Sequence, residues 1–441
     1  MPIQDAPVRE TARHGQDTAR RAEQIRAALD PTVAGPALRR MAGSPAAFFR
    51  GAAALFHHDL AVAGAGAPGA PYLDERTGRV WIHGDLHAGS FGAYLDATGR
   101  LVFGVTASGE GYVGPFTWDL KRCAASIALL GHARGLSDAR ITELVTAFAA
   151  AYREQVRALA SGAGAAPPCT LDTASGPLLT VLRAARARTR AGLLAPLTEL
   201  SDGERHFAGG PDTVALDAAA RYTVLAAFDG YLETLPESGP ARPEAYRVKD
   251  VVGRCGPGAT GGAATYDLLL EGGSDVLESD VVLTMKRARP PALARYRPVP
   301  EVAAQVRHDG HRAVLARRAL QAHADPWLGW AELDGAGLVV DEVSPYGAGL
   351  DWSGLDDPEE IAAAVAGLGH ITAAAHAAGD GKGGHPLVPF RPERAIDAAL
   401  AADEDGFGPL LADFAHSCAA RTRADHRIFV ELLRDGRIAV R

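Results

Sequence analysis

The chain has 441 residues, a length that suits two lobes or one large domain. Hydrophobic residues make up 47% and charged residues 22%, as in an ordinary soluble globular protein, and the formal net charge is −8. The negative balance argues against a general binder of nucleic acid or of acidic membranes, because phosphate groups are bound by basic surfaces. No signal-peptide core and no apolar run long enough to span a bilayer is evident, so we expect a cytoplasmic protein.

The N-terminal part of the chain is predicted to be helical. Residues 1–30 have helix-compatible spacing without a strong apolar stripe, and Leu38 to Ala63 indicates two helices divided at Ser44-Pro45. Ser44 is a candidate N-cap, with Pro45 at the first helical position. Arg50 follows on the second helix, where it is expected either to contact an anion near the site or to form an ion pair with Asp59 or Asp119.

A polar loop then stands between two apolar stretches. Val80 to Ile82 is predicted to be a short buried strand, and Leu101 to Phe103 the returning strand after a turn at Leu95 to Gly99. The intervening loop begins His83-Gly84-Asp85-Leu86-His87-Ala88-Gly89-Ser90. A His-x-Asp sequence with an amide residue five positions after the Asp is the order of the kinase catalytic loop, in which the Asp accepts the substrate hydroxyl proton and an Asn holds Mg²⁺. The fifth position here is Ser90 instead of Asn.

The following segment is again predicted to be mainly helical. Phe116 to Gly131 forms one helix, with Asp119 in its first turn, and Ser137 caps the next. Four arginines then stand close together between Arg183 and Arg190. Such a run is a solvated helix face or a rim that binds phosphate or carboxylate groups.

The pattern changes to strands at Arg247. Val248 to Val252 and Tyr266 to Leu270 are predicted strands, and a third strand ends in Lys286. In kinases a glycine-rich hairpin covers the nucleotide phosphates and a lysine on the third strand pairs with them. The turn between the first two strands contains the glycines that would allow such an approach, or that would simply make a flexible tip: Gly256, Gly258 and Gly261.

The last part returns to helices. Val302 to Ala324 is predicted to be one long helix, in the place of kinase helix C. A strand from Leu338 to Val343 carries Glu342 and leads to a hinge at Ser344 to Gly347. Ile361 to Ala378 is a helix with His370 and His376, which we expect to pack or form hydrogen bonds, because spacing places no third metal ligand near them.

Several of these stretches resemble the domain-of-unknown-function 2252 family. They are Met41 to Leu60, His83 to Gly92, Gly114 to Ser126 and Arg247 to Trp330. The family is placed in the kinase-like superfamily, and the loop is similar to the His-Gly-Asp-Leu-His motif of aminoglycoside-phosphotransferase-like small-molecule kinases.

The resemblance implies an α+β, two-lobed protein-kinase-like fold with a helical large lobe and a small antiparallel-sheet lobe. Because the catalytic loop precedes the glycine-rich sheet, it also implies a circular permutation, which neighbouring chain ends make tolerable. On this interpretation residues 1–246 and 346–441 form the large lobe and residues 247–345 the small one.

The sequence departs from the family at the positions that would bind a metal. The family reads Val-Phe-Asp-Leu-Asn-Asp-Phe-Asp-Glu where residues 102–110 are VFGVTASGE, and Glu110 alone retains its carboxylate. The resemblance places Gly104 at the position of the metal-binding Asp and Ser90 at that of its companion Asn. Mg²⁺ needs carboxylate or comparable oxygen ligands, so both expected ligands are lost. Leu315 also stands where a glutamate partner of Lys286 is expected. We therefore predict neither a metal nor a cofactor.

The remaining candidates form an acidic pocket for a small-molecule substrate. We expect the catalytic residues among Asp85, His87, Glu110 and Asp119, and the binding residues to be Arg50, His83, Ser90, Lys286, Glu342 and the three turn glycines. The favoured hypothesis is a metal-independent enzyme for a cyclisation, elimination or isomerisation, in which burial raises the pKa of Asp85 or Glu110 so that it serves as general acid or base. The alternatives are an ATP- and Mg²⁺-dependent phosphotransferase using Glu110 and Asp119 as metal ligands, and a non-catalytic pseudokinase.

Overall fold

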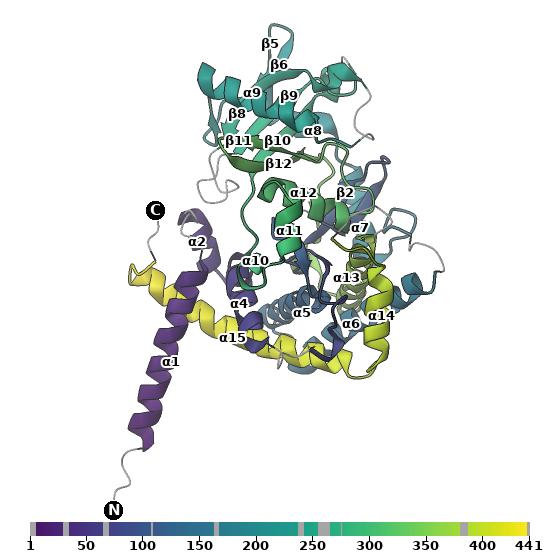
Figure 1. The fold of residues 1–441 in the computed structure, drawn as a ribbon. Coiled ribbons are helices and arrows are strands. Elements are labelled where there is room, and N and C mark those ends of the chain that lie inside the picture. The colour runs from purple at the N-terminus through teal and green to yellow at the C-terminus, as the bar shows by residue number, and fades with distance from the viewer. Residues whose placement is uncertain are drawn as a thin grey trace, which may run out of the picture.

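The chain folds into a helical unit and a sheet unit, so the fold is α+β as predicted (Figure 1). The computed structural model describes residues 6–29, 35–64, 70–106, 109–162, 167–236, 242–254, 265–274, 276–379 and 387–438, with the side chains from residue 17 onward. The helical unit contains both ends of the described chain, and α1 extends away from it in Figure 1. The sheet unit is formed by the middle of the chain.

The N-terminal helices are α1 (Ala6–Ala28), α2 (Gly35–Ala42), α3 (Pro45–Gly51) and α4 (Ala53–Ala63). The predicted cap of α3 is confirmed, because the Ser44 side chain accepts a hydrogen bond from the Ala47 amide at 3.1 Å and Pro45 follows it. The chain breaks once more at Ala52, which the sequence did not predict. One buried cluster joins these helices to the end of α15 (Phe407–Arg434).

The polar loop joins two separate pairs of strands. β1 (Val80–Ile82) pairs with β4 (Tyr112–Gly114), whereas β2 (Phe91–Leu95) forms the hairpin with β3 (Leu101–Val105). The predicted return of the chain to β1 through the 101–103 strand is therefore wrong. The turn was predicted correctly, since the Asp96 carboxylate accepts hydrogen bonds from the amides of Thr98 and Arg100 at 2.9 and 3.0 Å.

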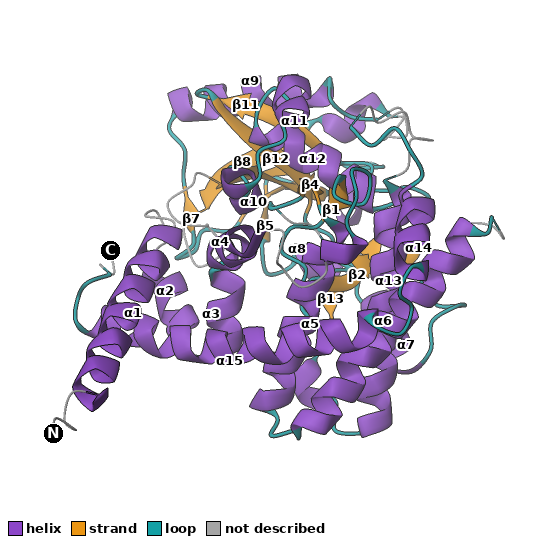
Figure 2. Cartoon of the chain, turned by 60° about the horizontal axis from the view of Figure 1, so that its bottom comes forward, coloured by secondary structure: helices purple, strands orange, loops and turns teal. Residues whose placement is uncertain are grey.

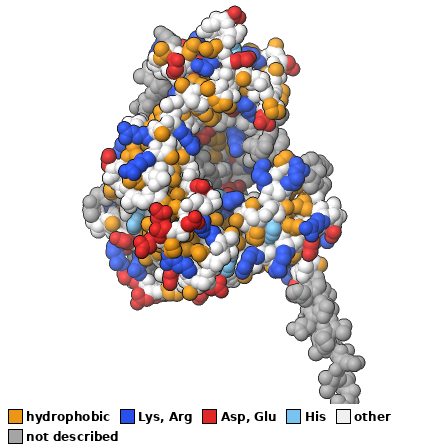
Figure 3. Space-filling model, turned by 180° about the vertical axis from the view of Figure 1, so that it is seen from behind, with side chains coloured by type: hydrophobic (Ala, Val, Ile, Leu, Met, Phe, Trp, Pro, Cys, Tyr) orange, Lys and Arg blue, Asp and Glu red, His pale blue; other side chains and the backbone are white. Residues whose placement is uncertain are grey.

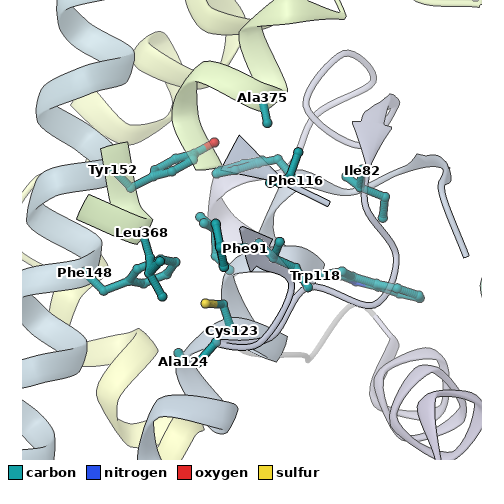
Figure 4. Close-up of a cluster of buried hydrophobic side chains, with 14 of the residues drawn as sticks. Ile82, Phe91, Phe116, Trp118, Cys123, Ala124, Phe148, Tyr152, Leu368 and Ala375 are labelled. Carbon is teal, nitrogen blue, oxygen red and sulfur yellow. The ribbon is translucent and has the colours of Figure 1, made fainter. Parts of the chain in front are cut away.

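The core of the helical unit lies between the loop strands and long helices. Its elements are α5 (Phe116–Ala133), α6 (Asp138–Ala160), α7 (Gly176–Arg186), α13 (Pro358–Ala378), α14 (Pro392–Ala401) and α15. Figure 4 shows Phe91 of β2 between Cys123 of α5 and Leu368 of α13. Figure 2 shows α15 lying across the helical unit below α5 and α6. By burying the start of α5, this core fixes the base on which the polar loop rests.

Helix α13 is long and apolar enough to cross a membrane by length and composition alone, so the sequence does contain one such stretch. Half of its most apolar window is buried inside the structure, where the helix packs along α6. It also buries the polar ring of His376 at its end. These are the features of a core helix in a soluble protein, while cytoplasmic location remains a prediction.

The sheet unit is an antiparallel sheet in the order β11-β12-β10-β9-β8-β7. The strands are β7 (Thr213–Val214), β8 (Val248–Arg254), β9 (Thr265–Leu270), β10 (Val281–Arg287), β11 (Gly329–Leu333) and β12 (Ala336–Glu342). Helix α9 (Ala218–Leu232) buries Phe228 and Tyr231 against one face, with Leu283 and Met285 of β10. Helix α9 belongs to this core and β7 pairs with β8, so elements before residue 247 also contribute to the sheet unit, while the predicted lobe boundaries stay a prediction.

The opposite face of the sheet meets a short hairpin and helix. These are α8 (Arg190–Leu194), β5 (Thr198–Ser201) and β6 (Glu204–Phe207). Leu194 and Phe207 pack there against Leu269 and Val282, which lie on the face of the sheet opposite the α9 core. Each face of the sheet therefore has a hydrophobic cover of its own.

Helix α12 (Asp309–Leu320) lies between the two units and contacts β11, β12, β1 and β4. It follows α10 (Ala292–Tyr296) and α11 (Pro300–Gln305), so the long helix predicted from residue 302 to 324 is wrong. The break arises because His308 leaves the helical conformation and its ring nitrogen accepts a hydrogen bond from the His311 amide at 3.1 Å, capping α12. After β12, β13 (Ala348–Gly349) pairs with β2 of the loop hairpin.

Candidate functional site

Asp119, in the first turn of α5, holds the start of the polar loop. Its two carboxylate oxygens accept hydrogen bonds from the amides of His83 and Gly84 at 2.6 and 2.9 Å. The ring of His376 lies 3.3 Å away and is itself hydrogen-bonded to the Tyr152 hydroxyl at 2.8 Å. Burial works against ionisation, but His376 and the backbone amides lower the pKa of Asp119 below its usual value. Asp119 therefore holds the loop in position, and its predicted place among the catalytic residues stays a prediction.

Gly84 allows the loop to pass close to Glu110. Its φ of +76° favours glycine, and a β carbon there would lie 2.2 Å from the carbonyl oxygen of Glu110. The His57 ring is 2.7 Å from the Gly84 carbonyl and is stacked on Trp118. Burial lowers the pKa of His57 to about 4, so the ring is neutral and donates this bond. His57 was missed by the sequence reasoning, although it falls within the stretch that carries the family resemblance.

Asp85 is paired with a buried arginine. Nε of Arg122 donates to its Oδ1 at 2.6 Å, and the Arg122 guanidinium lies over the rings of Phe49 and Phe56, 4.4 and 5.0 Å from their centroids. Arg122 is fully buried and also donates to the Phe49 carbonyl at 3.0 Å, whereas 23% of the Asp85 side chain is exposed. The pair presents a fixed, partly open carboxylate. Sequence reasoning did not single out Arg122.

The rest of the loop is closed by its own hydrogen bonds. The Ser90 hydroxyl donates to the Asp85 carbonyl at 3.0 Å and accepts from the His87 amide at 3.1 Å, which makes Ser90 part of the loop scaffold. Nδ1 of His87 accepts from the Gly89 amide at 3.0 Å. Burial, with a smaller contribution from Arg122, lowers the pKa of His87 to about 4 against the opposing effect of Asp85. The neutral ring therefore carries its proton on Nε2, as a hydrogen-bond donor.

Glu110 has the protonation behaviour expected of an acid or base at neutral pH. Burial raises its pKa to about 7, and the charge of Asp85 adds to this effect. The amide of Ala292 at the start of α10 donates to its Oε2 at 2.6 Å and works in the other direction. The backbone on both sides is held by Arg312 of α12, which donates to the carbonyl of Gly109 at 2.8 Å and to that of Gly111. Glu110 is thus fixed beside Gly84.

Gly104 lies in the middle of β3, opposite Gly92. A β carbon at this position would be 3.1 Å from the ring of Tyr94. A carboxylate at residue 104 would therefore have to displace that ring before it reached any ion. Of the other two positions in this stretch where a carboxylate is replaced, Gly109 is exposed and Ala107 lies outside the described residues.

The structure describes only part of the predicted nucleotide-binding set. Lys286 is exposed on β10 and makes no ion pair within the described part of the chain. Leu315, at the position of its expected partner, packs against the main core. Gly256, Gly258 and Gly261 lie outside the described residues.

Arg50 is also separate from the predicted contacts. Its side chain is exposed, and among the described residues it forms no ion pair. Asp59, one of its proposed partners, pairs with Arg21 of α1 at 2.7 Å, and the other, Asp119, is occupied by the loop amides. The predicted ion pair is therefore wrong, while an anion contact at Arg50 remains a prediction.

The arginine-rich segment braces the end of β12. Arg190 pairs with Glu342 at 2.6 Å, and Arg188 donates to the carbonyl of Gly347. Burial raises the pKa of Glu342 to about 7, with Arg190 opposing the change. Arg183 and Arg186 are exposed. One arginine of the run thus binds a carboxylate, but it is the protein's own, and Glu342 is part of this brace.

The groups that come together are Asp85, His87 and Glu110, supported by Asp119, Arg122 and His57. Helix α12 links them to the sheet unit. It contacts β11 and β12 of the sheet, and the side-chain amide of Gln321, directly after the helix, donates to the Val105 carbonyl of β3 at 2.7 Å. Figure 3 shows that the back of the molecule is hollowed between the sheet unit and the helical unit.

Comparison with known proteins gives one family. A family model described as an uncharacterized protein conserved in bacteria (DUF2252) matches residues 30–432. No curated protein and no solved structure matches the chain.

Proposed function

The chain belongs to the DUF2252 family, whose description specifies no reaction, and from that premise we propose that it is a small-molecule enzyme in which Glu110 acts as a general acid/base beside a fixed Asp85 carboxylate. The reaction class is a proton-transfer reaction such as an isomerisation, elimination or cyclisation. It requires neither a metal ion nor a nucleotide. The substrate is a small organic molecule bound between the two units.

The observation that carries this proposal is the contrast between two neighbouring carboxyl groups. Asp85 is paired with the guanidinium of Arg122 at 2.6 Å, whereas desolvation and the nearby charge of Asp85 raise the pKa of Glu110 to about 7. Two titratable groups whose surroundings separate their behaviour are the usual basis of acid and base roles. A pKa near the working pH gives Glu110 both protonation states in quantity.

His87 completes the chemistry at the loop. Its neutral ring with a proton on Nε2 would donate a hydrogen bond to a substrate carbonyl or hydroxyl as negative charge develops there. Glu110 would remove a proton from one substrate atom and return it to another, so that an isomerisation leaves the enzyme unchanged. Asp119 and Arg122 act through the loop, as positioning residues.

The proposed scaffold is a circularly permuted kinase-like fold. Support comes from the chain order β8-β9-β10, then the helices α10, α11 and α12, then β11-β12, so that α12 follows three strands of the sheet and precedes two more. The loop with the His-Gly-Asp sequence lies below α12 and precedes the sheet in the chain. Fold alone does not assign the reaction.

Phosphoryl transfer is disfavoured by the residues themselves. Asp119, one of the possible substitute metal ligands, uses its oxygens on two backbone amides and His376. Ser90 is bonded within the loop, and Lys286 is exposed. Phosphoryl transfer depends on positioning and on metal charge, and these residues provide neither.

The test is comparative mass spectrometry of small-molecule extracts incubated with the purified protein, without added ATP. Glu110→Gln keeps the acceptor for the Ala292 amide but cannot titrate, so we expect conversion to fall by about 10² or more. Asp85→Asn should also reduce conversion, yet the pH profile should keep its transition near pH 7. Glu431→Gln, on an exposed position of α15, serves as the matched control.

Two results would contradict the proposal. One is unchanged conversion by Glu110→Gln with a pH profile like that of the wild type. The other is a conversion that appears only with ATP and Mg²⁺ and adds the mass of a phosphoryl group, which would favour the phosphotransferase.

A further inference from the structure

Three side chains that can ligate a metal meet where α5, α6 and α15 converge, separate from the Asp85 loop. They are His132 in the last turn of α5, Asp138 at the first position of α6 and His416 of α15. One ligand atom from each lies within 4.8 Å of the other two, and the two imidazole centroids are 6.3 Å apart. His132 and Asp138 stand on consecutive helices, and His416 comes from a distant part of the chain, so folding is needed to complete the cluster.

We propose that His132, Asp138 and His416 bind one Zn²⁺ ion or a similar first-row divalent ion. Two imidazoles and a carboxylate are a ligand set that suits Zn²⁺, and three protein ligands leave a fourth position for water. Ca²⁺ and Mg²⁺ prefer sets of oxygen ligands, and this cluster offers only one carboxylate. Zn²⁺ ligands stand about 3.2 to 3.5 Å apart given bond lengths near 2.1 Å, so small rotations of exposed side chains complete the site.

The surroundings of the histidines support the site. Thr142 lies one turn along α6 from Asp138, and its hydroxyl is 2.9 Å from Nε2 of His416, which restrains the orientation of that ring.

Charge at the site works in both directions. The Asp138 carboxylate favours a cation, whereas Arg423, about two turns further along α15 than His416, is close enough to act on His132 and opposes one. Removing the Arg423 charge should therefore tighten metal binding. If these residues had only a structural role and bound no metal, removal of the Arg423 charge would not be expected to tighten Zn²⁺ binding.

The bound ion would join the end of α5 to the start of α6 and the middle of α15. Helix α5 also carries Asp119 and Arg122 at its other end, so the ion would stabilise the helix on which the loop rests. Any ligand that binds only the native state raises its stability by mass action. The expected effect is on thermal stability, with no step in the reaction.

The experiment is a Zn²⁺ and Co²⁺ titration of tag-free, metal-stripped full-length protein. We expect one ion per chain, a Co²⁺ absorption spectrum of the intense tetrahedral type, and a rise in melting temperature that EDTA reverses. His132→Ala and His416→Ala should each weaken binding by about 10-fold or more. His370→Ala removes an exposed histidine of α13 and should leave binding unchanged, and Arg423→Gln should tighten binding by about 2- to 5-fold.

The proposal is overturned if His132→Ala and His416→Ala bind Zn²⁺ with the stoichiometry and affinity of the wild type. It is also overturned if His370→Ala weakens binding as much as they do, which would indicate adventitious surface binding. Far-ultraviolet circular dichroism of each variant verifies its fold, and the Arg423→Gln gain tests the site without touching a ligand.

Discussion

The polar loop and the face of the sheet that would bind a nucleotide beside it differ in how their side chains are held in place. In the loop, Asp119 and His57 hold the backbone at His83 and Gly84 through buried hydrogen bonds, and Arg122 holds the Asp85 carboxylate. On the sheet, Lys286 is exposed and Leu315 occupies the place of its expected partner. The loop is held by buried hydrogen bonds, whereas the lysine predicted to bind phosphates is exposed and forms no ion pair in the described part of the chain.

The difference has an energetic reason. Loss of one partner from a buried charge network strongly destabilises the folded state, because the remaining charges stay unpaired in a low-dielectric interior. An exposed lysine can lose its partner at almost no cost. The stability of the fold therefore partly explains why the loop has this network. The raised pKa of Glu110 is the one feature of the two regions that favours a catalytic role.

The largest expected effect comes from breaking the loop network. Asp119→Ala leaves the amides of His83 and Gly84 and the ring of His376 without their acceptor. We expect the free energy of unfolding to fall by about 3 to 5 kcal/mol in urea titrations. A loss below about 1 kcal/mol would show that the network is not what holds the loop.

A smaller effect is expected from removing the titration of Glu110. Its pKa is raised from 4.5 to about 7, so the folded state binds more protons than the unfolded state in that interval, and its contribution to stability falls as pH rises from about 4.5 to 7. Glu110→Gln should therefore be more stable than the wild type at pH 8 by about 1 to 3 kcal/mol, with little difference at pH 4.

The matched comparison is Glu342→Gln, since the pKa of Glu342 is also raised to about 7 but its carboxylate is paired with Arg190. Loss of that ion pair should reduce the gain at pH 8. Equal pH dependence of the wild type and Glu110→Gln in chemical denaturation would contradict the account of Glu110.

The smallest effect is expected on the sheet. Lys286→Ala should change the free energy of unfolding by less than about 0.5 kcal/mol, because the side chain is exposed and unpaired in the described part of the chain. Mg²⁺-ATP should shift the melting temperature of neither protein. A shift of several degrees that is lost in Lys286→Ala or with EDTA would instead indicate a working nucleotide site.

The sequence predicted what depends on local pattern. The Ser44 cap, the turn at Asp96 and the α+β composition follow from turn residues, caps and periodicity, and the structure has them. The raised pKa of Glu110 was also among the expected possibilities, since a lone carboxylate in an apolar stretch becomes desolvated.

The remainder depends on contacts between distant segments. Local pattern does not show that β1 pairs with β4, or that His376 reaches Asp119 across 257 positions of sequence. The helix break at His308 was missed because histidine is an uncommon cap. Arg122 was passed over because a Lys-Arg pair at a helix start is ordinarily solvent-exposed, whereas here the fold buries it against Phe49 and Phe56.

The most direct test of the central claim is the pKa of Glu110 itself. The carbonyl band of a protonated carboxyl group in the infrared spectrum is followed from pH 4 to 9 for the wild type and for Glu110→Gln. Their difference isolates Glu110 from Glu342 and other carboxyl groups. The account predicts a difference band that disappears with a midpoint at about pH 7. A midpoint below pH 5 would contradict it, because Glu110 would then be a permanent anion at neutral pH.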